Sequence, residues 1–61
     1  MENSELIVYL DACRPWLTNA KKRGGGFVSA FADAVLRADL DNLRILVPAL
    51  TKLREKYPNY D

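Results

Sequence analysis

Residues 21–38 read KKRGGGFVSAFADAVLRA, a basic triplet and three glycines that lead into a strongly apolar segment. The periodicity of this segment predicts a helix from about Phe27 to Ala38. Its broad apolar face holds Phe27, Phe31, Ala34, Val35 and Ala38. The polar side chains form only a thin stripe, with Asp33 and Arg37 spaced to make an ion pair, and a helix this apolar has to be covered on nearly all sides. We therefore expect it to be the buried centre of the fold, and to drive self-association because two flanking helices leave part of it exposed.

The basic triplet and the glycines in front of this helix have two explanations. Cations stabilise the last turn of a helix, so the triplet is expected to end a preceding helix, with Gly24 as its left-handed cap. The functional explanation is an anion site, because cations and free backbone N–H groups at a helix N-terminus suit a phosphate. That candidate site consists of Lys21, Lys22, Arg23, Gly24, Gly25 and Gly26. The glycine spacing matches neither of the common phosphate-binding loops, so capping is the favoured explanation.

A helical stripe also runs through the first third of the chain. It consists of Leu6, Leu10, Cys13 and Leu17, and the helix is expected to start at an Asn3 or Ser4 cap. Pro15 removes one backbone hydrogen bond, so it either kinks a single helix or separates two short ones. The stripe continues in phase across Pro15, which favours one kinked helix. Trp16 is expected to be a core anchor, with a binding hot spot as the alternative.

The last third of the chain predicts another helix, from an Asp39 or Asp41 cap to about Tyr57. Apolar residues recur at spacings of three and four and form a seam like that of a coiled coil. The seam consists of Leu43, Leu46, Leu50, Leu53 and Tyr57. Pro48 lies off the seam and is expected to kink the helix towards solvent, whereas Pro58 ends it. Residues 59–61 are expected to be a frayed tail.

Composition limits the chemistry that the chain can perform. Its 61 residues make a single helical domain, residues 1–61, with a net charge of +1. There is no histidine and only one cysteine, Cys13, so we expect no disulfide, metal site, cofactor or catalytic residue, and no enzyme activity. Near-neutral charge also argues against tight binding to nucleic acid. The chain shows no signal peptide or membrane span, which predicts a cytoplasmic protein without a membrane partner.

These patterns together predict an all-α fold, a small three-helix bundle that assembles as an oligomer. The expected function is a non-enzymatic interaction protein whose partners are itself and another protein. The predicted interface consists of Trp16, Phe27, Phe31, Val35, Leu43, Leu46, Leu50, Leu53 and Tyr57. The alternative is a binder of a nucleotide, another phosphate-bearing ligand or nucleic acid, through the basic and glycine residues 21–26.

The second half of the chain also carries a pattern-level resemblance to known proteins. The pattern comprises Gly26-Phe27, Ala30-Phe31-Ala32, Ala34, Arg37-Ala38-Asp39, Asn42, Leu46, Pro48-Ala49-Leu50 and Lys56-Tyr57-Pro58. It resembles small uncharacterised helical proteins encoded by phages and prophages, over about residues 24–58. The resemblance implies an accessory phage protein in the cytoplasm of a bacterial host, where it binds and inhibits or redirects a host protein such as a defence factor.

Overall fold

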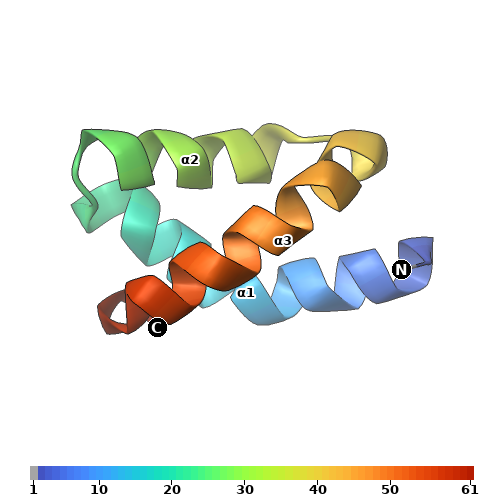
Figure 1. The fold of residues 1–61 in the computed structure, drawn as a ribbon, viewed down its shortest axis with the longest axis horizontal. Coiled ribbons are helices and arrows are strands. Elements are labelled where there is room, and N and C mark those ends of the chain that lie inside the picture. The colour runs from blue at the N-terminus through green and yellow to red at the C-terminus, as the bar shows by residue number, and fades with distance from the viewer. Residues whose placement is uncertain (1) are drawn as a thin grey trace.

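The computed structural model describes residues 2–61, and in that range the chain forms three α-helices and no strand. Helix α1 spans Asn3–Arg23, α2 spans Gly26–Arg37 and α3 spans Leu40–Lys56, followed by a short 3-10 turn, η1, at Pro58–Tyr60. Successive helices run in opposite directions, and α3 crosses α1 obliquely (Figure 1). The predicted all-α, three-helix fold is confirmed.

Helix α1 is the central element, since α2, α3 and η1 all pack against it. Within residues 2–61 the buried core consists of Leu6, Cys13, Trp16, Leu17, Ala20, Val28, Ala32, Val35, Leu43 and Leu50, and the first five belong to α1. The expectation that the helix at 27–38 would be the centre is therefore wrong. The physical reason is length: 21 residues at 1.5 Å each give α1 about 31 Å of surface, enough for both neighbours, whereas α2 has 12 residues.

Helix α1 continues without interruption through Pro15, so the chain does not form two short helices here. Helix α3 likewise continues through Pro48, and both prolines are exposed. The kinks at these prolines stay predictions. The cap at the start of α1 is Glu2 rather than Asn3 or Ser4, because Glu2 and Glu5 form a reciprocal capping box in which the Glu2 N–H donates to Glu5 Oε1 at 3.1 Å.

Residues 59–61 are docked onto α1 and α3, so the prediction of a frayed tail is wrong. The indole Nε1 of the fully buried Trp16 donates to the Tyr57 carbonyl at 2.8 Å, and the Trp16 ring meets the Tyr60 ring edge-on at 5.9 Å. The Asn19 amide donates to the Tyr60 carbonyl at 2.8 Å. The two hydrogen-bonded pairs each lie 41 residues apart in the chain, which is why no local pattern reveals them.

Gly24 ends α1 in an extended conformation, with φ −70° and ψ 157°, so the predicted left-handed cap is wrong. The glycine is needed for a different reason, which is lack of space. A Cβ atom at Gly24 would collide with the carbonyl oxygen of Ala20 and would lie 3.1 Å from Val28 Cγ1. Gly25 and Gly26 face open space. Gly24 therefore allows the close approach of α1 and α2, whereas its two neighbours have no such role in this chain.

Candidate functional site

The broad apolar face predicted on α2 is only partly used by the core. Val28, Ala32 and Val35 are the buried residues of α2. Beside them runs an apolar row that we call the α2 stripe: Phe27, Phe31, Ala34 and Ala38. Phe27 is 65% exposed and its ring stacks on that of Phe31, with 6.4 Å between the ring centroids. Phe27 and Ala34 are exposed and Phe31 and Ala38 are half-buried against the core, so the stripe remains partly at the surface, although its spacing of four, three and four is that of a packed helix face.

An apolar groove of about 300 Å³ lies where the C-terminal half of α2 meets the first turns of α3. Its lining consists of Ala34, Arg37, Ala38, Asn42, Ile45 and Leu46. Asp39 turns the chain into α3 by accepting the Asn42 N–H at 2.9 Å, which brings Ile45 towards α2. Ile45 is 74% exposed. The α2 stripe and this groove share Ala34 and Ala38, so they form one continuous apolar surface.

The structure divides the predicted interface residues into three groups. Four are fully buried in the core of the chain: Trp16, Val35, Leu43 and Leu50. Phe31, Leu46, Leu53 and Tyr57 are half-buried, and only Phe27 is exposed. The leucine seam of α3 thus packs against the chain's own core. The sequence-based prediction missed Ile45. The signal that could have found it is that Ile45 is a large apolar side chain outside the leucine seam, on the outer side of α3.

The basic triplet is largely engaged within the chain. Lys21 Nζ lies 3.0 Å from Asp33 Oδ1, and Asp33 also pairs with Arg37 at 3.1 Å, as the spacing predicted. Arg23 lies over the Tyr60 ring, 5.6 Å from its centroid. Lys22 is exposed and makes no ion pair with the residues that the structure describes. The three predicted anion-binding cations therefore do not converge on one point.

The glycine loop offers room but no further ligand group. The N-cap of α2 is Gly25, which has no side chain to cap the helix, and the first turn of α2 carries no acidic residue. The Ser29 hydroxyl, which could have faced an anion, donates to the Lys21 carbonyl at 2.8 Å instead. The loop therefore keeps the open N-terminus of α2 and one unpaired cation, Lys22, as its only anion-binding features.

Hydrogen bonds from Lys21 and then Arg37 hold the pKa of the Asp33 carboxyl below its ordinary value of 3.8. A depressed pKa in the folded state contributes stability above the unfolded value, and this stability is lost as the pH falls through the folded pKa. We therefore expect Asp33→Asn to have a lower melting temperature than the unmodified chain at pH 7. The difference between the two melting temperatures is expected to close as the pH falls below 3.8. Thermal melts of both proteins between pH 2 and 7 measure it, and a gap that stays constant over that range would contradict the ion-pair explanation.

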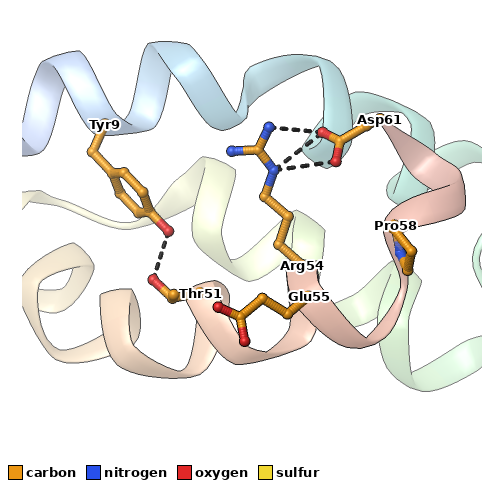
Figure 2. Close-up of a pocket in the computed structure, with 6 residues that line it drawn as sticks. All are labelled: Tyr9, Thr51, Arg54, Glu55, Pro58 and Asp61. Atoms are coloured by element: carbon orange, nitrogen blue, oxygen red, sulfur yellow. Dashed lines mark hydrogen bonds and ion pairs between the residues drawn. The ribbon is translucent and has the colours of Figure 1, made fainter.

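A second concave region, of about 430 Å³, lies between α1, α3 and the C-terminus (Figure 2). Tyr9 and Thr51, which both line this region, share a hydrogen bond of 2.6 Å, and Arg54 donates to the Asp61 carboxylate at 2.8 Å. Asp61 raises the pKa of Arg54, and burial raises the pKa of the Tyr9 phenol. The buried Cys13 sulfur accepts a hydrogen bond from Arg54 at 3.4 Å. The side chains of Tyr9, Thr51, Arg54 and Asp61 are therefore engaged in pairs that join α1, α3 and the C-terminus, whereas the exposed Glu55 lies outside these pairs.

No known protein family, curated protein or solved structure matches the chain. Within residues 2–61 no helix is long and apolar enough to cross a membrane. The same residues contain no cluster of three or more side chains able to hold a metal ion.

Proposed function

We propose that this chain is a small non-enzymatic helical interaction protein that self-associates through the α2 stripe and the adjoining groove. The observation that carries the proposal is the continuity of this surface, from Phe27 at one end to Ile45 at the other. Single exposed apolar residues are ordinary on monomers, but a continuous apolar surface beside a groove is typical of an interaction site. The exposed fractions of Phe27 and Ile45, 65% and 74%, leave most of both side chains available for burial.

The total accessible surface agrees with a local interface rather than an incomplete fold. The chain exposes 3931 Å², close to the roughly 4,000 Å² expected of a compact monomer of this mass. Each chain thus folds around its own core, and association adds contacts at one surface. Burial of apolar area contributes about 25 cal/mol per Å², so covering the exposed side chains of this surface would favour association.

A charge placed within the surface is expected to prevent association. Ile45→Glu would bury a carboxylate without a partner, which costs more than about 1.4 kcal/mol and weakens association at least about tenfold. Val8→Glu is the matched control, since Val8 is 68% exposed and lies on the outer side of α1. Light scattering over a concentration series measures the mass of each protein, and circular dichroism checks that both remain helical. Association that survives Ile45→Glu, or that Val8→Glu disrupts equally, would place the interface elsewhere.

The wider proposal is that the same surface binds a second kind of protein. Its support is the resemblance of residues 24–58 to phage-encoded helical proteins, which implies action on a host factor in the bacterial cytoplasm. Capture from bacterial lysate by the unmodified chain, compared with Ile45→Glu, tests this proposal. A host protein retained equally by both chains would show that the apolar surface is not its binding site.

The alternative function is binding of a phosphate-bearing ligand at residues 21–26. The open space beside Gly25 and Gly26 favours it, together with the exposed Lys22. The ion pair of Lys21 with Asp33 and the packing of Arg23 on Tyr60 argue against it. Thermal shift against a panel of nucleotides tests this alternative, with Lys22→Ala as the control. A shift that persists in the control, or no shift at all, would exclude the loop as an anion site.

A further inference from the structure

Residues 57–61 pack on one face of α1 and on Arg54 of α3, through contacts of the kind by which proteins bind peptides. We infer that this face is a peptide-binding site, which the chain's own residues 57–61 occupy as an intramolecular ligand. The peptide class that fits the site is a short segment with an aromatic side chain followed directly by a carboxylate. The α2 stripe contributes no residue to this site, so the inference is independent of the proposed self-association.

The α1 face holds the backbone of residues 57–61. Trp16, Asn19 and Arg23 follow one another at spacings of three and four, so they share one side of the helix. Each of these side chains donates a hydrogen bond to a main-chain carbonyl of the segment, at 2.8, 2.8 and 3.4 Å respectively. Any peptide offers such carbonyls. The three donors therefore supply affinity without selecting a sequence.

Selectivity comes from two side chains of the segment. The Tyr60 ring lies edge-on to the Trp16 ring, and the Arg23 guanidinium lies 5.6 Å from the Tyr60 centroid. The Asp61 carboxylate accepts from both Nε and Nη2 of Arg54, at 3.1 and 2.8 Å. A guanidinium that binds a carboxylate through two N–H groups recognises its position as well as its charge. The site therefore selects an aromatic ring with a carboxylate at the next residue.

The segment is held weakly enough for an external peptide to displace it. The 3-10 turn contains no buried residue, and the side chains of Arg54 and Asp61 remain 32% and 43% exposed. Exposed ion pairs contribute little to stability, and segments with few buried contacts open while the rest of the fold stays intact. Pro58 and Asp61 also line the concave region of about 430 Å³, so the segment leaves space between α1 and α3 unfilled.

A fluorescent peptide that repeats residues 56–61, Lys-Tyr-Pro-Asn-Tyr-Asp with both ends blocked, tests the site in the whole chain. Its fluorescence anisotropy is measured against the unmodified chain and against Tyr60→Ala. The apparent affinity is reduced by the fraction of chains in which the site is closed, and loss of the aromatic contact opens the site. We therefore expect Tyr60→Ala to bind the peptide about tenfold more tightly. Asp61→Asn weakens the exposed ion pair, is expected to act in the same direction, and serves if Tyr60→Ala does not fold.

Two charge-matched variants of α1 identify the binding face. Arg23→Ala and Arg14→Ala are each combined with Tyr60→Ala. Both remove one arginine, but Arg23 contacts residues 57–61 whereas Arg14 makes an exposed ion pair within α1. We expect Arg23→Ala to weaken peptide binding about fivefold and Arg14→Ala to leave it unchanged. Circular dichroism checks that each variant is folded.

Three results would overturn the inference. The first is a peptide that binds the unmodified chain as tightly as it binds Tyr60→Ala and Asp61→Asn. The second is no binding to either of these variants at about 1 mM peptide. The third is an equal change in affinity from Arg23→Ala and Arg14→Ala, which would place the peptide away from this face of α1.

Discussion

Trp16→Ala is expected to remove most or all of the stability of the chain. The side chain is fully buried, donates a hydrogen bond to the Tyr57 carbonyl and packs on Tyr60, so its loss opens the joint between α1 and the C-terminus. Truncation of a buried tryptophan costs about 3–5 kcal/mol. The free energy of unfolding of small proteins is roughly 0.05–0.15 kcal/mol per residue, so a chain of 61 residues has little stability beyond the cost of this truncation. Urea unfolding followed by circular dichroism measures the loss.

Two milder variants keep this prediction testable if Trp16→Ala does not fold. Trp16→Phe retains an aromatic ring but not the indole N–H, and Tyr60→Ala removes the ring on which Trp16 packs. Each is expected to lower the free energy of unfolding by about 1–2 kcal/mol, from one lost hydrogen bond or one lost aromatic contact and its buried area. If both variants unfold at the same urea concentration as the unmodified chain, the docking of the C-terminal turn on α1 is wrong.

Gly24→Ala is expected to destabilise the chain by about 1–3 kcal/mol, the usual cost of a methyl group placed where there is no room for it. The added Cβ would collide with the Ala20 carbonyl oxygen in the last turn of α1 and would lie 3.1 Å from Ser29 N and Val28 Cγ1 of α2, so the turn between the helices would have to shift. The backbone angles of Gly24 suit any residue, so lack of space is the only source of the effect. Thermal and urea melts measure it.

The two neighbouring glycines supply the matched controls. Gly25→Ala and Gly26→Ala add the same methyl group in open space, at negative φ angles or within a helix. Gly26→Ala is expected to stabilise the chain by about 0.4–1 kcal/mol, because alanine restricts the unfolded chain and favours the helix. Equal effects at all three positions would contradict the close approach assigned to Gly24.

The helices were predictable because their signals are local. Apolar spacing, the basic residues at the end of α1, the Asp39 cap and the stop at Pro58 all act within a few residues, and each agrees with the structure. The docked C-terminal turn was not predictable, because it depends on contacts between Trp16 and residues 41 or more positions away. The space beside Gly24 depends likewise on how α1 and α2 meet.

The candidate surface was predictable only in part. Spacing alone places Phe27, Phe31, Ala34, Val35 and Ala38 together, but it does not show which side of that face the core covers. The core takes Val35 and leaves Phe27 exposed, because α1 lies against only one side of α2. Ile45 joins the surface through the angle between α2 and α3, which no periodicity specifies.

Sedimentation equilibrium of the unmodified chain over the micromolar range tests the central claim, self-association through α2, most directly. The predicted result is a mass that rises with concentration from the 6.9 kDa of one chain to twice that value, and that stays at 6.9 kDa for Ile45→Glu. A folded chain that remains at 6.9 kDa throughout the range would contradict the claim.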